Sequence, residues 1–121
     1  GPITSEQLEA LYSIADVFLF PSRHEGFGWP PLEAQSTECP VVASNNGSLA
    51  EILGDSGLTA NWDDTAAHSQ NVQRILSDSK LRNSLVSKGL HNASRFSSSA
   101  MTEAFCQIYC EMEEFRTKKT R

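Results

Sequence analysis

The stretch ADVFLFPSRHEGFGWPPLEAQSTECPVVAS, residues 15–44, decides the fold of this chain. Residues 17–20 and residues 41–44 are short apolar runs followed by turn residues, which is typical of strands buried on both faces of a parallel sheet. Between them, Pro30 and Pro31 favour the start of a helix, because proline is tolerated in the first helical turn. A strand, a helix and a second strand in this order predict a βαβ unit.

The same alternation continues on both sides of this unit. A third short strand is expected at residues 58–60. Helical periodicity and capping residues predict five further helices: 5–14 with a capping box from Thr4 to Gln7, 49–53 capped by Ser48, a helix from Asp64 to about residue 77, a helix from Ser79 to about residue 95, and 100–115. The order predicts an α/β fold with a parallel sheet and flanking helices. Three strands are few for such a sheet, so we expect a part of a larger domain.

The two ends of the chain differ from its body. Gly1 and Pro2 look like an expression-tag scar, and residues 116–121 are expected to be a basic, frayed tail. Residues 3–115 are then expected to form one domain fragment. The chain has 121 residues, of which 39% are hydrophobic and 21% charged, and this composition suits a globular domain with a small core.

Charge and hydropathy exclude several classes of function. The net charge of −5 argues against nucleic acid or an anionic membrane as the main partner. No apolar run approaches the length of a membrane span, and no signal peptide is visible. We therefore expect a cytoplasmic protein, or one that lies peripherally at the inner face of a membrane.

The cysteines and two of the histidines suggest no metal site. Cys39, Cys106 and Cys110 are an odd number without dense spacing, which suggests a reducing compartment. Cys106 and Cys110 share one helical face and are expected to be buried as small apolar residues. His68 and His91 are expected at the surface of peripheral helices.

The loop after the first strand offers the chemistry of a ligand site. Ligands of open α/β sheets bind at the carboxyl ends of the strands. There Gly26 and Gly28 allow the backbone close to a ligand, and the first amides of the next helix favour an anion such as phosphate. Glu25 and Glu33, eight positions apart, can accept hydrogen bonds from vicinal hydroxyls. Phosphate donors between two hydroxyl acceptors match a nucleotide sugar.

A plainer interpretation stays open at this point, in which the glycines only form turns and both glutamates are solvated. Neighbouring residues are open in the same way. Arg23 and His24 could bind phosphate or sugar, or be bystanders. Asn45, Asn46 and Ser48 could reach a ligand, although turn and capping roles explain them too.

The motifs in this region closely resemble glycosyltransferase family 4, and more closely the C-terminal, donor-binding domain of a retaining glycosyltransferase of the GT-B fold. The resemblance rests on these segments: 15–22, Glu25 to Gly28, 31–34, 39–44, and Gly47 with Glu51. The family's hallmark, two glutamates with seven residues between them, is matched by Glu25 and Glu33. Trp29 stands where many members carry leucine, and it is expected to pack under the loop. The resemblance implies a Rossmann-like sheet.

The resemblance implies a donor site made of six residues: Glu25, Gly26, Phe27, Gly28, Leu32 and Glu33. Glu25 would contact the hydroxyls of the donor sugar and help to orient the sugar as the phosphate departs, and it is the expected catalytic residue. The amides of residues 26–28 would hold the sugar and the distal phosphate. Leu32 would pack near the nucleoside, and Glu33 would accept hydrogen bonds from the ribose.

The function implied is transfer of a hexose from a UDP- or GDP-linked sugar to a glycan or lipid-linked acceptor, with retention of configuration. No metal or other cofactor is expected. The acceptor domain and the family's diphosphate-binding arginine and lysine would lie outside this chain, so we expect the fragment alone to be inactive. The alternative is a non-catalytic module for nucleotide-sugar binding or scaffolding. An open edge of the truncated sheet is expected to cause self-association.

Overall fold

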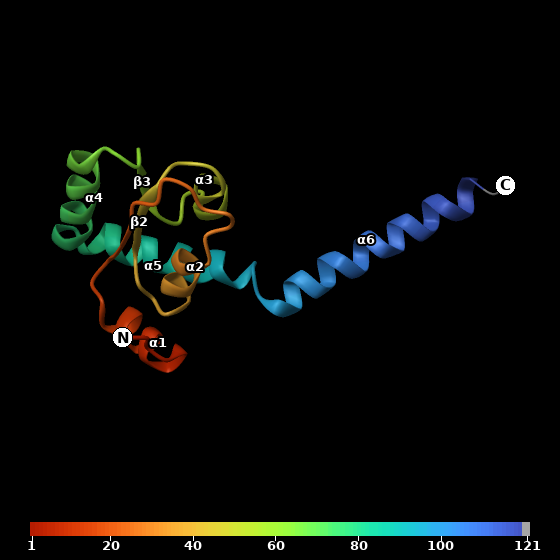
Figure 1. The fold of residues 1–121 in the computed structure, drawn as a ribbon, viewed down its shortest axis with the longest axis horizontal. Helices are drawn as coiled ribbons and strands as arrows, with labels where there is room; N and C mark the ends of the chain where they lie inside the picture. Colours follow the sequence, from red (N-terminus) through yellow and green to blue (C-terminus); the bar gives the residue numbers. More distant parts are fainter. Residues whose placement is uncertain (120–121) are drawn as a thin grey trace.

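A computed structural model of the chain describes the backbone of residues 1–119 and the side chains of residues 1–113 (Figure 1). Over these residues the chain forms three strands: β1 (Phe18–Phe20), β2 (Val41–Ser44) and β3 (Leu58–Ala60). The same residues include six helices: α1 (Ser5–Ile14), α2 (Trp29–Ser36), α3 (Ser48–Leu53), α4 (Thr65–Ser77), α5 (Ser79–Ser94) and α6 (Ser98–Lys119). The strands are parallel and lie in the order β1-β2-β3. The predicted α/β fold with a parallel sheet and flanking helices is confirmed.

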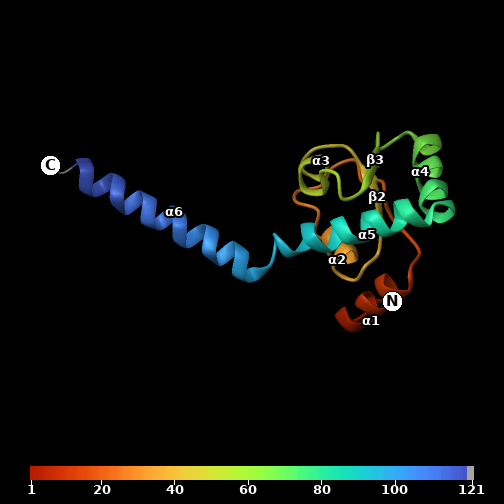
Figure 2. The same cartoon turned by 180° about the vertical axis from the view of Figure 1, so that it is seen from behind.

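Helices cover both faces of the sheet (Figures 1 and 2). Val41 and Ala43 of β2 belong to a core cluster that α1, α2 and α3 complete. Val42 points to the opposite face and packs with Ile75 of α4 and Leu85 of α5. Burying one such side chain contributes about 1.5–3 kcal/mol, and a shift of one residue would exchange the two faces. All four residues of β2 are therefore buried, which explains the continuous apolar run.

The edge strand β1 differs from the sequence-based prediction. All four residues of β2 are buried, as expected, but Leu19 in the middle of β1 is 45% exposed. Within residues 1–119, β1 pairs only with β2, so one of its edges has no strand partner. The expectation that β1 is buried on both faces is wrong for this structure, because no described element covers the outer side of Leu19.

The helix caps confirm two predictions and correct two. Thr4 and Gln7 form the capping box of α1, and Asp64 accepts the hydrogen bond of the Ala67 amide at the start of α4. Ser48 does not cap α3, because it is the first residue of that helix. Ser79 does not cap α5 either: the Asp78 carboxylate one residue earlier accepts from two amides of the first turn.

Three predictions of side-chain burial are also wrong. His68 is only 4% exposed, and neither ring nitrogen has a hydrogen-bond partner in the structure. Cys106 and Cys110, expected inside, are exposed. The apolar residues of the last helix predicted a face packed on the sheet. The helix instead extends away from the sheet, so these two cysteines stay exposed. His91 is exposed, as expected.

The last helix, α6, extends away from the sheet and its covering helices (Figure 2). It begins two residues earlier than predicted and its backbone remains helical through Lys119, past the expected end at residue 115. The tail predicted at residues 116–121 is therefore partly helical, and its last two residues lie outside the described part. No helix among the described residues combines the length and apolar character that a bilayer crossing requires.

Candidate functional site

The carboxyl ends of all three parallel strands lie at one edge of the sheet, where ligands of α/β folds bind. A hollow of about 580 Å³ opens there, between the loop after β1 and the loop after β2. Its lining residues are Arg23, His24, Glu25, Gly26, Asn46 and Gly47. The structure thus places two of the six predicted donor-site residues, Glu25 and Gly26, in one concave surface.

Hydrogen bonds from the β2 side hold the loop after β1 in place. The Asn46 side-chain amide donates to the carbonyl oxygen of Arg23 (3.3 Å). The Ser48 hydroxyl donates to the carbonyl oxygen of Glu25 (3.1 Å). Asn46 and Ser48 were open candidates in the sequence, and their side chains here contact the loop backbone. The spacing along the chain carries no signal for such bonds, since the partners are 23 positions apart.

The two glycines of the loop have different roles. Gly28 precedes α2 with φ at +108°, and a Cβ atom there would lie 2.8 Å from Cδ2 of the buried Leu49. Only glycine fits this position without strain. A Cβ atom on Gly26 would meet no described atom within 4 Å. Protein packing therefore requires Gly28, whereas the space beside Gly26 is open for a ligand.

The remaining residues between the glutamates are largely engaged in packing. The Phe27 ring contacts Trp29 (4.9 Å between centroids) and meets Phe96 edge-on (5.7 Å). Trp29 is still 46% exposed, so it packs beside Phe27 rather than under the loop. Leu32 is 4% exposed, which leaves little of its side chain for a nucleoside.

Glu33 does not share the hollow of Glu25. It lines a separate hollow of about 330 Å³ on the α1 side of α2, together with Tyr12. Among the described residues, the linings of the two hollows have no member in common. Burial first, and then the charge and hydrogen bond of the Glu33 carboxylate, raise the pKa of Tyr12. The expectation that both carboxylates face one crevice is thus not met here, because Glu33 lies on the α1 side of α2 and Glu25 lies in the loop before that helix.

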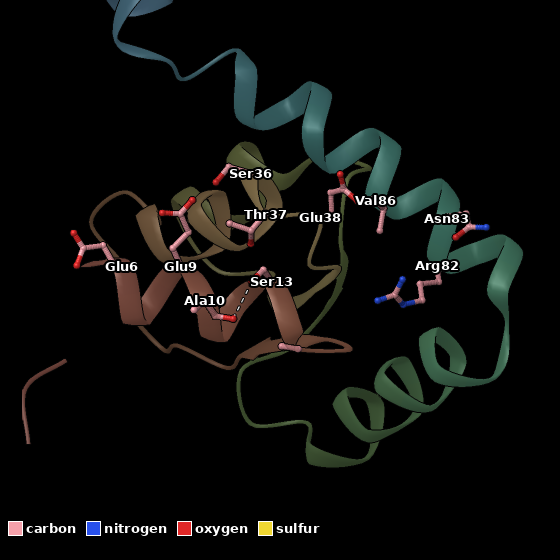
Figure 3. A pocket seen from close by; sticks show the side chains of 11 residues that line it. Glu6, Glu9, Ala10, Ser13, Ser36, Thr37, Glu38, Arg82, Asn83 and Val86 are labelled. Atoms are coloured by element: carbon pink, nitrogen blue, oxygen red, sulfur yellow. Dashed lines mark hydrogen bonds between the residues drawn. The ribbon is translucent and has the colours of Figure 1, made fainter. Parts of the chain in front are cut away.

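A larger hollow, of about 740 Å³, lies elsewhere, between α1, the end of α2 and α5 (Figure 3). Arg82 points into it, and Glu6, Glu9 and Glu38 also line it. Glu38 lies just before β2, so this hollow is near the amino ends of the strands, opposite the edge where ligands of such sheets bind. The described residues contain no group of three or more His, Cys, Asp or Glu side chains placed to hold a metal ion.

Comparison with known proteins shows the family of this chain. The family model of the "Glycosyl transferases group 1" matches residues 1–91. The chain belongs to this family. It is 43% identical over 97 residues to an O-antigen chain mannosyltransferase B of Escherichia coli, a match that covers 80% of this chain and 26% of the relative. It is 35% identical over 112 residues to a D-inositol 3-phosphate glycosyltransferase of Salinispora arenicola, covering 91% of this chain and 25% of that protein.

A solved structure shares the fold of this group 1 chain. Sucrose-phosphate synthase from Thermosynechococcus elongatus superposes with a TM-score of 0.81 at 31% identity, over 94% of this chain and 29% of that one. The α/β architecture is therefore that of part of a GT-B glycosyltransferase, as predicted. The chain spans about a quarter of the length of the curated relatives described above.

Proposed function

We propose that this chain is the donor-binding part of a retaining glycosyltransferase of family 4. The whole protein would transfer a hexose from a UDP- or GDP-linked sugar to a glycan or lipid-linked acceptor. The observation that carries the proposal is the hollow at the carboxyl edge of the sheet, where Glu25 and the open backbone at Gly26 lie together. Membership of the group 1 glycosyl transferases supports it.

Each part of the donor has a proposed partner. The Glu25 carboxylate accepts hydrogen bonds from the sugar hydroxyls. The amides of Gly26, Phe27 and Gly28, at the start of α2, bind the distal phosphate, since free amides and the helix dipole favour negative charge. Glu33 accepts from the ribose hydroxyls on the other side of the helix start, next to Leu32.

The proposed reaction breaks the bond between the anomeric carbon and the phosphate oxygen. The acceptor oxygen bonds to the same face of the anomeric carbon and passes its proton to the departing phosphate, and the nucleoside diphosphate leaves with the electron pair of the broken bond. Amides aimed at the departing phosphate stabilise its growing charge. The nucleotide sugar is a substrate of this reaction and not a cofactor. The proposal assigns no step to a metal ion or to any other cofactor.

The remainder of the protein completes the enzyme in this proposal. The chain spans about a quarter of its curated relatives, so acceptor binding and further diphosphate contacts are assigned to the rest, and the isolated chain is expected to be inactive. We assign residues 3–115 to a fragment of the C-terminal donor-binding domain. The odd number of cysteines supports a cytoplasmic location, or one at the inner face of a membrane.

One observation favours the alternative, a module that binds or scaffolds without catalysis. Glu25 and Glu33 line separate hollows, so the pair does not converge on one surface in this structure.

An NMR titration of the chain with UDP-, GDP- and ADP-linked sugars tests the donor site. Amide shifts confined to residues 25–33 with one nucleotide are expected, and they should be lost in Glu25→Ala but kept in Glu103→Ala, an exposed site on α6.

Transfer assays with the full-length protein then separate the two functions. Transfer from the nucleotide sugar that shifts those amides supports the enzyme, and its loss in Glu25→Ala supports the catalytic role of Glu25. Binding of donor without transfer to any glycan or lipid-linked acceptor would support the scaffolding module. Equal binding by wild type and Glu25→Ala would refute the donor site.

A further inference from the structure

Arg23 is held by the loops after all three strands. It belongs to the loop after β1, and its carbonyl oxygen accepts the hydrogen bond of Asn46 from the loop after β2. Its guanidinium carbon lies 4.9 Å from the ring centroid of Trp62, in the loop after β3. A cation at this distance over an indole ring is attracted by the ring's electron-rich face. The long side chain of Arg23 is thus restrained, although it lies at the surface.

The charge of Arg23 is not neutralised by a neighbouring carboxylate. Within the part of the chain that the structure describes, Arg23 forms no ion pair, and the ion pair between Lys88 and Asp55 involves neither Arg23 nor the lining of this hollow. The guanidinium carbon lies over the Trp62 ring, and among the described residues no hydrogen bond uses the guanidinium N–H donors of Arg23, so these donors are available. A planar cation with a free edge is suited to two parallel hydrogen bonds to an oxyanion.

The hollow itself needs a cation if it is to bind a phosphate. Its lining contains one carboxylate, Glu25, and one permanent cation, Arg23. A diphosphate brings further negative charge close to Glu25, and like charges at such distances repel by several kcal/mol outside bulk water. Backbone amides carry only partial charge, so they offset this repulsion incompletely.

We propose that Arg23 is an anion-binding residue of the donor site, positioned by Trp62, and that its guanidinium binds phosphate oxygens of the nucleotide sugar. This inference rests on the proposed function and adds to it a charged partner for the diphosphate within this chain. Arg95 is the matched control: its guanidinium carbon lies 5.6 Å from the Phe96 ring centroid, but it does not line the hollow.

The test measures dissociation constants of the 121-residue chain for UDP-glucose and GDP-mannose by NMR titration, in wild type and variants. Arg23→Gln is expected to weaken binding of the preferred nucleotide sugar about tenfold or more, because a charge-assisted hydrogen bond is lost. Trp62→Leu keeps the charge but frees the side chain, and it should weaken binding about two- to fivefold. Arg95→Gln should bind like wild type. The NMR spectrum of each variant reports whether its fold is intact.

Each outcome decides a separate point. If Arg23→Gln binds the preferred nucleotide sugar as tightly as wild type, the inference is overturned and the proposed donor site stands. If Trp62→Leu matches wild type while Arg23→Gln is impaired, the anion-binding role stands and the positioning role of Trp62 is overturned. If the wild-type chain binds neither nucleotide sugar, the titration is repeated with the full-length protein, and absence of binding there overturns both the proposed function and this inference.

Discussion

Replacing Gly28 by alanine tests the reasoning about the loop most directly. Alanine at φ +108° adopts a strained backbone, which costs about 1–3 kcal/mol. Its Cβ atom would also lie 2.8 Å from Cδ2 of Leu49, whose side chain is fully buried. Overpacking of this kind costs about 1–3 kcal/mol. Together we expect Gly28→Ala to lower the free energy of unfolding by about 2–5 kcal/mol.

Gly26→Ala is the matched control, two positions earlier in the same loop. A Cβ atom there meets no described atom within 4 Å, so the free energy of unfolding should change by no more than about 0.5 kcal/mol. The added methyl group occupies the hollow beside Glu25, however. On the proposed function, Gly26→Ala should therefore weaken nucleotide-sugar binding while leaving stability intact, the opposite of the pattern expected for a packing glycine.

Urea unfolding followed by circular dichroism measures both variants against wild type. With a urea dependence of about 1–3 kcal/mol per M, a loss of about 3 kcal/mol lowers the midpoint by about 1–3 M. A Gly28→Ala midpoint equal to that of wild type would refute the reasoning, since it would mean that Leu49 and the helix start yield without cost. Equal destabilisation by Gly26→Ala would refute the assignment of open space beside that residue.

Three further predictions concern other parts of the chain. Asn92→Ala removes the side-chain amide that donates to the Gln35 side-chain oxygen and to the Ile52 carbonyl oxygen, both buried. It should lower the free energy of unfolding in urea by about 2–4 kcal/mol, and an unchanged midpoint would contradict this. Because the pKa of Tyr12 is raised in the folded state, its contribution to the free energy of unfolding is fully present below pH 10 and is lost as the pH rises through the folded-state pKa. Tyr109 is the other tyrosine of the chain, so in a Tyr109→Phe background an absorbance titration reports on Tyr12 alone. There Glu33→Gln should lower the pKa of Tyr12, and an unchanged pKa would exclude the contact with Glu33. The open edge of β1 should cause self-association, which Leu19→Lys should reduce in light scattering; a wild-type chain that stays monomeric at high concentration contradicts this.

Local signals were sufficient to predict the elements that position the site. Apolar runs of strand length, proline in the first helical turn and the capping box at Thr4 act within a few residues. They placed β2, β3, α1 and the start of α2 correctly. The loop after β1 followed from this order, because the carboxyl ends of parallel strands share one edge.

Contacts between distant segments were the features that sequence reasoning missed. Tyr12 interacts with Glu33 across 21 positions, and the Arg23 guanidinium lies over the Trp62 ring across 39. Neither pair has a periodic or spacing signal, since each depends on how α1 and the β3 loop pack around the sheet. The burial of His68 escaped prediction for the same reason. Its position on α4 identifies a helical face, but only the packed structure shows which face is covered.

The contact between Tyr12 and Glu33 is compatible with a ribose-binding role for Glu33. A carboxylate has about four acceptor sites, and a hydrogen bond from the Tyr12 hydroxyl uses only one of them. The others can accept two vicinal hydroxyls, so Tyr12 would orient Glu33 rather than block it. Tyr12→Phe should then weaken nucleotide-sugar binding roughly two- to tenfold with little change in the free energy of unfolding. Tighter binding by this variant would show that Tyr12 competes with the ribose for Glu33, and the separation of the two glutamates would then count against the donor site.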